Sequence, residues 1–421
     1  MGVDPHTAVS ESLLTVPQEI ARIAALPQVR GGMSWLRAQE SQFAAWQLEL
    51  SRIAAPPFGE TARGQWLADV FRQLGLQNVH QDEVGNVLGL RPGTGDHCVA
   101  LSAHLDTVFP AGTPLNVRQQ GTRLFGPGVS DNGAGVTAML AVASALQACK
   151  IANSLPVLFI GNVGEEGEGD LRGMRHIFST SRYKDLILQT LVLDGAGSDT
   201  IVSQALGSRR FEVIVRGPGG HSWSDFGAPN PILVLARAMH EFSQTTIPSS
   251  PKTTFNVGVV RGGTSVNSIP ESASMRVDIR STSMAEMQRL ESALRLALEH
   301  AITEESRITM ERRGVPQHRQ FGLTSEVVAI GNRPAGELDS SARILQIILA
   351  VDASLGNAAQ IQRASTDANI PLSLGREAIA IGGGGIGGGA HTLQEWFDCI
   401  GRDIGLKRIL LTLLALTGVG Q

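Results

Sequence analysis

The sequence predicts an α/β protein in which a mostly parallel sheet, flanked by helices, is interrupted by an inserted second domain. Apolar strand-like runs alternate with helical runs up to about residue 208, and the alternation resumes after about residue 317. Between these segments the order of expected elements changes. A chain of 421 residues with 42% hydrophobic content also exceeds the usual size of a single core.

The first segment is expected to begin with helices and then to alternate. Helical patches cover residues 16–55, Pro56 and Pro57 interrupt them, and an amphipathic helix over Ala62–Leu74 ends at Gly75. Strands are expected at Asn86–Leu90, Cys98–Leu105, Pro156–Val163 and Thr190–Leu193, with helices at Gly133–Ala148 and Leu171–Ser179. Such alternation favours parallel pairing, because each helix carries the chain back across the sheet.

The inserted domain is expected at 209–316, which leaves 1–208 and 317–421 as the two parts of the main domain. Its elements are expected at Arg210–Arg216, Pro231–Gln244, Thr253–Arg261, Ser272–Ser281, Met284–Glu304 and Arg307–Arg312. Their βαββαβ order is the split βαβ arrangement of ferredoxin-like units. The α/β pattern then resumes with a strand near Glu326–Gly331, a helix over Ser341–Leu355 and a strand at Ala378–Ile381.

Charge and cysteine content argue against several classes of partner. The formal charge is −4 and the pI is about 6.2, so no basic surface for nucleic acid or anionic lipid is expected. The apolar tail Ile409–Val419 is too short to cross a bilayer and is expected to form a buried helix. Met1–Glu11 lacks the pattern of a secretory signal, and Cys98, Cys149 and Cys399 form no disulfide framework. We expect a cytoplasmic protein that acts on a small molecule or peptide.

The run SAHLDT at 102–107 places His104 and Asp106 at the end of an expected strand. Residues two apart on a strand share a face, so the Asp106 carboxylate could bond the His104 imidazole and raise its basicity as a metal ligand. A solvated strand end is an equally ordinary interpretation of this run on its own.

Two further motifs place carboxylates where an expected strand ends or a helix begins. Asp131 lies in GPGVSDNGAG directly before a helix, where an Asp is commonly an N-cap. Glu165 and Glu166 follow a buried strand in GEEGEG, a type of loop that is also ordinary in solvent. Adjacent acids near a sheet edge repel each other unless a cation compensates them. The alternative interpretation is therefore a metal site, in which one acid binds the metal and its neighbour takes a proton from water.

Asp194 ends another expected strand, and His391 follows the glycine-rich run GGGGIGGG. Alone, a strand-end Asp is usually a turn former, and a single His is more often structural than a ligand. The carboxyl ends of parallel strands meet at one sheet edge, so these two residues could converge with His104, Asp131 and Glu166. Carboxylates and imidazoles without cysteine suit two zinc ions, with cobalt or manganese as alternatives.

In this order the motifs resemble the M20 family of metallopeptidases and deacylases, from about Pro56 to Trp396. They are most similar to the tripeptide aminopeptidase, or peptidase T-like, branch. The segments concerned are SAHLDTVFP at 102–110, SDNGAG at 130–135, GEEGEGDLRGM at 164–174, GPGGHS at 217–222, GGTSVNSIP at 262–270, STDANIPLSLG at 365–375 and GGGGIGGGAHTLQEW at 382–396. The resemblance implies a zinc-peptidase-like fold whose insertion is a lid and dimerisation domain.

The resemblance also implies how the metals are held. His104 and Asp194 would bind one zinc ion, and Glu166 and His391 would bind the other. Asp131 would bridge the pair, and the peptide bond that follows it would be cis. These roles come from the family and not from spacing in this sequence.

The same resemblance implies the residues that act on the substrate. Glu165 would be the general base, taking a proton from water and giving it to the leaving amine. In the lid, His221 would support the oxyanion in the partner's active site of a homodimer, while Asn267 and Arg280 would contact the polar end of the substrate. A turn His, a loop Asn and a solvent-facing Arg are the ordinary alternatives. Gly133 departs from many relatives, which carry Lys two positions after the bridging Asp.

The expected function is amide-bond hydrolysis in short peptides by an aminopeptidase, tripeptidase or dipeptidase. An N-acyl amino acid deacylase or a carboxypeptidase with the same chemistry is the alternative, and a non-catalytic scaffold on the same fold is a third. The glycine-rich run could bring main-chain N–H groups to the substrate or act as a linker. It lacks the Gly-Lys-Ser/Thr ending of a phosphate-binding loop.

Overall fold

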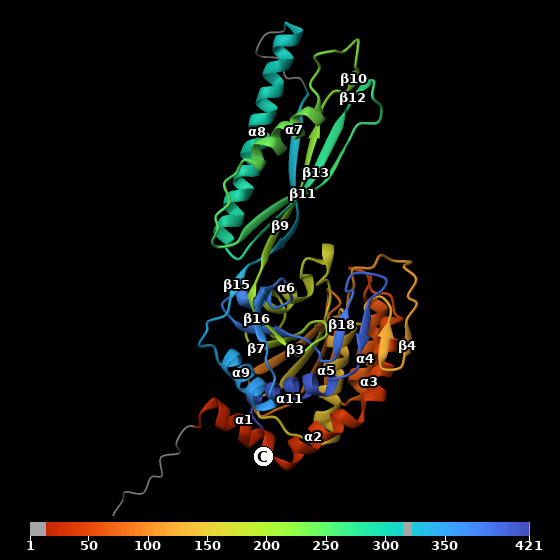
Figure 1. Cartoon of the computed structure of the whole chain (residues 1–421), viewed down its shortest axis with the longest axis vertical. Coiled ribbons are helices and arrows are strands. Elements are labelled where there is room, and N and C mark those ends of the chain that lie inside the picture. The colour runs from red at the N-terminus through yellow and green to blue at the C-terminus, as the bar shows by residue number, and fades with distance from the viewer. Residues whose placement is uncertain (1–13, 315–321, 421) are drawn as a thin grey trace, which may run out of the picture.

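The computed structural model describes residues 14–314 and 322–420, which form a large sheet covered by helices and a smaller sheet with two helices beside it. In Figure 1 the smaller sheet and its helices stand above the larger unit. The expectation about Met1–Glu11 concerns residues outside the described part of the chain.

The large sheet has a parallel centre and antiparallel edges. Its strand order is β1-β2-β6-β3-β7-β17-β8-β15, and β16 also pairs with β8. The central pairs β6 with β3, β3 with β7 and β7 with β17 are parallel, whereas β1 with β2, β2 with β6 and β15 with β8 are antiparallel. The bounds are β1 Gln77–Gln81, β2 Val87–Arg91, β3 Cys98–His104, β6 Val157–Asn162, β7 Ile187–Leu193, β8 Thr200–Ala205, β15 Gly336–Glu337, β16 Gln360–Ala364 and β17 Glu377–Ile381.

Helices cover both faces of this sheet, as the continuous burial of its central strand requires. Val99 and Leu101 of β3 belong to a core cluster that includes residues of α4, α5, α9 and α11, whereas Cys98 and Ala100 belong to a second cluster that includes residues of α6. A strand that is buried on both faces appears in the sequence as an unbroken run of apolar residues. Helices α1, α2 and α3 form a further layer against α5, α9 and α11. The bounds are α1 Val16–Ala25, α2 Pro27–Ala38, α3 Glu40–Ser51, α4 Thr61–Gln73, α5 Gly133–Ala148, α6 Arg172–Ser179, α9 Arg343–Leu355, α10 Asn369–Ser373 and α11 Arg402–Thr417.

Most elements expected for the main domain are present. Helix α5 has the predicted bounds, and the apolar tail lies in the buried helix α11. A small sheet of order β18-β19-β5-β4 was not predicted, because its strands are too short to show periodicity; they are β4 Arg118–Gln120, β5 Arg123–Phe125, β18 Ile386–Gly388 and β19 Trp396–Asp398. Among the described helices, none is long and apolar enough to span a membrane. All three cysteines are free thiols.

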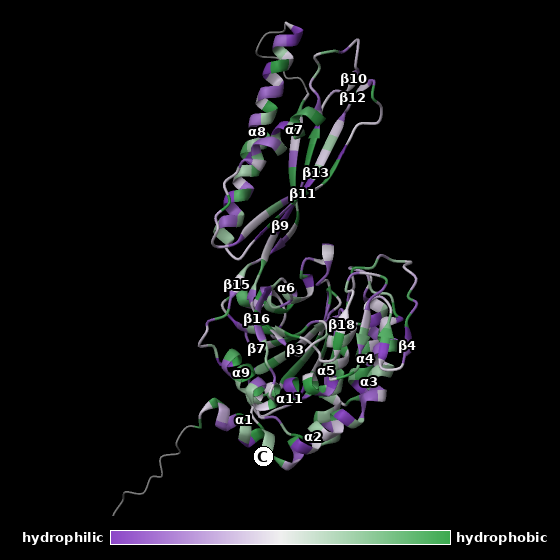
Figure 2. Ribbon diagram, in the orientation of Figure 1, coloured by the Kyte–Doolittle hydropathy of each residue, from purple (hydrophilic) through white to green (hydrophobic). Residues whose placement is uncertain are grey.

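The smaller sheet has the antiparallel order β11-β13-β9-β14, with α7 and α8 packed together on it. In chain order this is βαββαβ with the first strand beside the third and the fourth, the ferredoxin-like arrangement that the sequence predicts. This domain, called the lid below, has its own apolar core, and Figure 2 shows green residues alternating with purple ones along α8. The bounds are β9 Gly207–Arg216, α7 Pro231–Ser243, β11 Thr253–Gly262, β13 Ser272–Ser281, α8 Met284–Arg313 and β14 Thr324–Arg333. A two-stranded ribbon of β10 Gly220–His221 and β12 Ser268–Ile269 extends from it.

The prediction of a strand at Arg307–Arg312 is wrong, because these residues continue helix α8. Ala301, Glu305 and Thr309 are all buried at a spacing of four, which is the helical and not the strand period. The closing strand is β14, which pairs along β9 although the sequence assigned it to the main domain. The predicted boundary at 316 lies outside the described residues, and we propose that it falls after Arg333.

Candidate metal centre

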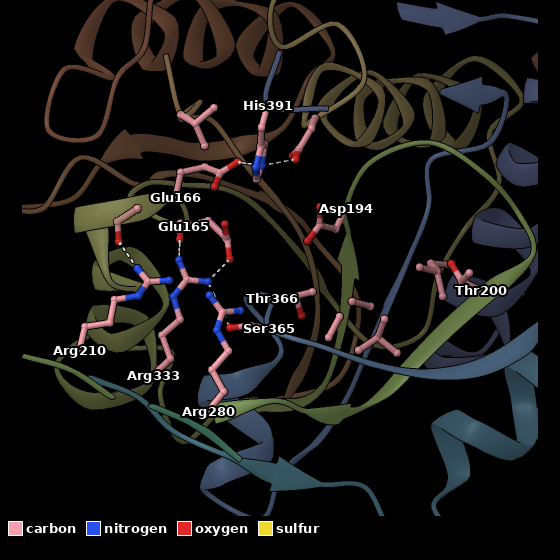
Figure 3. Close-up of a pocket in the computed structure, with 17 residues that line it drawn as sticks. Glu165, Glu166, Asp194, Thr200, Arg210, Arg280, Arg333, Ser365, Thr366 and His391 are labelled. Carbon is pink, nitrogen blue, oxygen red and sulfur yellow. Dashed lines mark hydrogen bonds and ion pairs between the residues drawn. The ribbon is translucent and has the colours of Figure 1, made fainter. Parts of the chain in front are cut away.

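Strand ends from distant parts of the chain deliver the candidate residues to one edge of the large sheet. His104 is the last residue of β3, Asp194 directly follows β7, and Glu165 and Glu166 come shortly after β6. His391 lies in the loop after β18, and Figure 3 shows its ring in contact with Glu166. The parallel centre of the sheet explains this convergence, since its strands all point their carboxyl ends the same way.

Possible ligand atoms form overlapping groups within 4.8 Å of one another. One group contains His104, Asp131 and Asp194, and another contains Asp131, Glu166 and His391. In the first, His104 Nε2 lies 3.2 Å from Asp131 Oδ1 and 3.7 Å from Asp194 Oδ1. In the second, His391 Nε2 lies 3.1 Å from both Asp131 Oδ2 and Glu166 Oε1. The Asp131 carboxylate therefore reaches both groups, one oxygen to each.

The chemistry of this donor set fits two cations. Asp131 Oδ1 is buried and has no hydrogen-bond partner although it lies beside His104, as a carboxylate oxygen reserved for a metal would be. A third group brings His104, Glu165 and Glu166 together, so buried acids crowd one small volume. The peptide bond between Asp131 and Asn132 is cis, as the family resemblance implied.

Burial and like charge perturb the acids of the centre. Burial, opposed by Arg333, raises the pKa of Glu165 to about 8. Burial also raises the pKa of Glu166 to about 8, assisted by the charges of Glu165 and Asp131. Burial would raise the pKa of Asp131 too, but its close contacts with the two histidines hold that pKa below its usual range. Ionised acids in this volume thus need compensating positive charge.

Asp106 does not orient His104 in the way predicted. Its carboxylate lies 3.7 Å from His104 Nδ1, while its backbone carbonyl lies 3.1 Å from that nitrogen and accepts the hydrogen bond. The carboxylate instead accepts the backbone N–H groups of Glu165 at 3.0 Å and Glu166 at 2.7 Å. The predicted face-sharing fails because β3 ends at His104, so the strand alternation does not extend to residue 106. Asp106 therefore positions the acidic loop directly.

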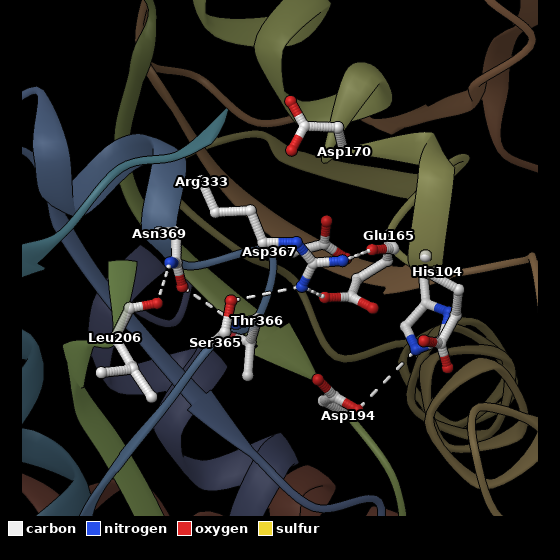
Figure 4. A network of polar contacts seen from close by, with 12 residues as sticks. His104, Glu165, Asp170, Asp194, Leu206, Arg333, Ser365, Thr366, Asp367 and Asn369 are labelled. Carbon is white, nitrogen blue, oxygen red and sulfur yellow. Dashed lines mark hydrogen bonds and ion pairs between the residues drawn. The ribbon is translucent and has the colours of Figure 1, made fainter. Parts of the chain in front are cut away.

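Arg333 is a residue of the centre that the sequence did not reveal. It is the last residue of β14, and its Nη1 donates to Glu165 Oε1 at 2.8 Å and to Ser365 Oγ at 3.2 Å. A second guanidinium nitrogen bonds the Glu165 carbonyl oxygen. Figure 4 shows this contact beside Asp367, a buried acid that accepts a bond from Asn162 at 2.6 Å. No local pattern distinguishes Arg333 from a solvent-facing strand residue.

Arginines from three strands of the smaller sheet line the cavity next to the centre. The cavity has a volume of about 580 Å³, and Figure 3 shows Arg210, Arg280 and Arg333 among its lining residues together with the candidate ligands. Asp278 pairs with Arg210 at 3.0 Å and with Arg280 at 2.7 Å, so two guanidinium groups share one carboxylate. Arg280 lines the cavity, and its contact with the substrate stays a prediction; Arg210, which also lines the cavity, was not predicted.

The other two lid candidates lie away from the centre. His221 is exposed in β10, at the far end of the lid in Figure 1, and its backbone N–H bonds Asp225 at 2.8 Å. Asn267 lies in the loop before β12, and its carbonyl accepts the Ser222 N–H at 3.0 Å. Neither residue lines the cavity. Their roles in catalysis stay predictions. Either role requires a second subunit or a movement of the lid that brings the residue to an active site.

Several residues of the glycine-rich run pack closely against other main chain. The N–H groups of Gly383 and Gly384 bond the carbonyls of Gly195 and Gly197 at 2.9 and 3.0 Å. A Cβ on Gly387 would lie 2.2 Å from Ser130 Oγ, so glycine is needed for the close approach of two loops. The N–H groups of Gly383 and Gly384 are therefore not free to bind a substrate, and for the rest of the run the expected contact stays a prediction.

Comparison with known proteins identifies a family relationship. The model of the peptidase family M20/M25/M40 matches residues 100–414. A probable carboxypeptidase of Ajellomyces dermatitidis is 33% identical over 218 residues, which cover 47% of this chain and 49% of that protein. The chain thus spans about half the length of the curated relatives it matches.

Solved structures share the fold at low identity. A tripeptidase from Staphylococcus aureus has a TM-score of 0.71 at 21% identity, covering 90% of this chain and 98% of that one. A dinuclear metal-binding peptidase of the M20 family from Bacillus subtilis has a TM-score of 0.63 at 14% identity, covering 90% and 99%. At these identities the likeness concerns the fold alone.

Proposed function

The chain belongs to peptidase family M20/M25/M40, and on that premise we propose that it is a hydrolase that uses two zinc ions to cleave amide bonds in short peptides. The observation that carries the proposal is the shared carboxylate of Asp131, which joins two groups of possible ligands. His104 and Asp194 would hold one ion, and Glu166 and His391 the other. Cobalt or manganese would suit the same nitrogen and oxygen donors.

Bound cations would polarise the substrate carbonyl and lower the pKa of the attacking water. The chain itself supplies the proton transfers. Glu165 Oε1 is held by Arg333, which leaves Oε2 to accept the proton of the water and to return it to the leaving nitrogen. The Asp106 carboxylate bonds the N–H of Glu165 and fixes the loop, so the base acts from a set position.

The charge of the cavity supports a substrate with a free carboxylate. Arg210 and Arg280 share Asp278, so one positive charge of the pair remains uncompensated. A second cavity of about 720 Å³ shares Arg280 and is lined by Lys252 and Arg363 without an acidic residue. Guanidinium groups suit carboxylate geometry because they can form two parallel bonds.

A carboxylate is carried by short peptides and also by N-acyl amino acids, so two substrate classes fit. We favour an aminopeptidase, tripeptidase or dipeptidase. The name of the Ajellomyces relative favours a carboxypeptidase as the second candidate, and an N-acyl amino acid deacylase would use the same arginines.

We further propose a homodimer formed through the lid, in which the partner's His221 completes the site. Large apolar side chains next to it support this arrangement, because Trp223 is 87% exposed and Phe226 is 70% exposed. A cytoplasmic location, and the absence of nucleic-acid and membrane partners, remain part of the proposal. Free Cys98, Cys149 and Cys399 are compatible with a reducing compartment.

The proposal is tested by profiling the zinc-loaded protein on matched tripeptides, dipeptides and N-acetyl amino acids, each with a free or an amidated carboxyl end. We expect release of the N-terminal residue from peptides with a free carboxyl end, and loss of turnover after chelation that zinc restores. Turnover of the N-acetyl set alone would replace the peptidase by a deacylase. Turnover that persists after all metal has been removed would contradict the proposed function.

A further inference from the structure

Glu395 is a buried acid that joins the two loops carrying Asp131 and His391. Its side chain has 0% exposure, and it lies four residues after His391. Glu395 Oε2 accepts the N–H of Gly128 at 2.8 Å, and Oε1 accepts the N–H groups of Ser130 and Asp131, both at 2.7 Å. One carboxylate thus fixes three main-chain groups of the loop between β5 and α5.

The main chain of Glu395 is tied to the same loop. Its carbonyl accepts the N–H of Gly126 at 2.9 Å, and the next residue begins β19, which pairs with β5. Both the backbone and the side chain of Glu395 therefore face the segment that ends in Asp131. These hydrogen bonds join the segment before the inserted domain to the segment after it. The join lies close in sequence to His391.

Other contacts leave this loop few alternative positions. Asn132 Nδ2 donates to the Leu193 carbonyl at 2.8 Å, next to Asp194. On the far side, Gln47 of α3 donates to the Val129 carbonyl at 2.5 Å. Among these contacts, only the bond accepted by Glu395 Oε1 involves the N–H of Asp131 itself. Removal of that carboxylate would leave the amide of Asp131 buried without its acceptor.

We propose that Glu395 is a positioning residue whose carboxylate sets the metal affinity of both ligand groups by fixing the main chain of Asp131. The proposal rests on the proposed function, because it assumes that these groups bind metal. Asp131 belongs to both groups, so a displaced Asp131 weakens both. Partners that orient a ligand commonly contribute about 10- to 100-fold in metal affinity.

A purely structural role for Glu395 would have a different signature. Loss of a buried acceptor lowers the stability of any fold, but it changes metal affinity only where a ligand moves. Glu377 provides the matched control, because its carboxylate accepts the N–H groups of Arg343 at 3.1 Å and Ile344 at 3.2 Å at the start of α9. It also caps main-chain N–H groups, and it does not line the cavity.

The experiment compares Glu395→Gln with Glu377→Gln in the full-length protein. A glutamine keeps the size of the side chain but must direct an NH2 group toward at least one of the three N–H donors. We measure amide hydrogen exchange of residues 126–131 in the metal-free proteins, and zinc affinity by competition with a chelating dye. Glu395→Gln should speed exchange in that segment and weaken zinc binding about 10- to 100-fold at both sites, whereas Glu377→Gln should do neither.

Unchanged zinc affinity in a folded Glu395→Gln protein would overturn the proposal, and so would an equal loss in Glu377→Gln. If Glu395→Gln does not fold, Glu395→Asp replaces it, since it keeps the charge but shortens the side chain; weakened zinc binding is again expected, and unchanged binding again overturns the proposal. Neither readout depends on turnover. Failure to hydrolyse any peptide would therefore contradict the proposed function while leaving the positioning role standing.

Discussion

The main domain and the lid present their candidate residues in opposite ways. In the main domain, His104 and Glu165 are buried, and the candidate metal ligands around them gather at one edge of the large sheet. In the lid, His221 is exposed and distant from the cavity, and the large apolar side chain of Trp223 beside it is exposed as well. One chain can complete the first set of contacts, whereas the second set requires another surface. The contacts of a buried site can therefore be identified within one subunit, whereas the functional contacts of an exposed residue such as His221 cannot.

The largest effect is expected from replacing the base of the main domain. Glu165→Gln removes the proton acceptor but keeps the size of the side chain, so turnover should fall about 10³-fold, within the range of general acid–base catalysis. Metal content should stay at that of the unmodified protein. Steady-state hydrolysis and atomic emission measure the two quantities. Glu168→Gln is the control, because Glu168 is exposed in the same loop. A Glu165→Gln enzyme of near-normal rate would assign the base elsewhere.

The next effect tests whether the lid acts on the partner subunit. His221→Ala should lower turnover about 10²-fold, as loss of an oxyanion donor does, without changing zinc affinity. Mixed dimers of His221→Ala and Glu165→Gln chains should regain activity. In such a dimer one site has both the Glu165 base and a His221 from the other chain. Absence of any recovery in mixed dimers that are shown to form would place His221 outside the site.

The difference between the domains also explains what could be predicted from the sequence. Residues at strand ends, such as His104 and Asp194, were found because the direction of a parallel strand determines the edge at which it ends. Arg333 was missed because its role depends on the pairing of β14 with β9, which no local periodicity reveals. Glu395 was not singled out from the sequence, since a carboxylate that accepts N–H groups of a distant loop leaves no local pattern.

The incorrect strand at Arg307–Arg312 has a related cause. Ile308 and Met310 alternate with polar residues, as the residues of a strand would. The buried face of helix α8, however, includes a polar residue. Glu305 is buried, accepts the N–H of Asn230 at 2.9 Å and pairs with Arg237 of α7. In a sequence, a buried acid of this kind cannot be distinguished from a solvent-exposed one. Hydrophobic periodicity therefore gave the wrong element here, because polar tertiary contacts bury this position in place of an apolar side chain.

Removal of metal should lower the stability of the main domain but not that of the lid. All candidate ligands lie in the main domain, and the lid has its own core, which includes Leu290 and Leu294. Free zinc at about 100 times its Kd would stabilise the main domain by about 2.7 kcal/mol. Chelation should therefore speed amide exchange in β3 and β7 but not in β9 and β13. Equal loss of protection from amide exchange in both sheets would show that the domains unfold as one unit. That result would contradict the expected difference between them.

The smallest effect concerns Arg280, the lid residue that does reach the cavity. Its charge is expected to bind the substrate carboxylate equally before and during the reaction, so Arg280→Met should raise KM about tenfold and leave kcat nearly unchanged. Arg276→Met is the control, because Arg276 lies on the same strand but pairs with Glu212 outside the cavity. Substrates with an amidated carboxyl end lack the charge that Arg280 would bind. Their KM should therefore be the same for both arginine variants and the unmodified enzyme, and a tenfold rise with an amidated substrate would mean that Arg280 supports the cavity wall and does not read the carboxylate.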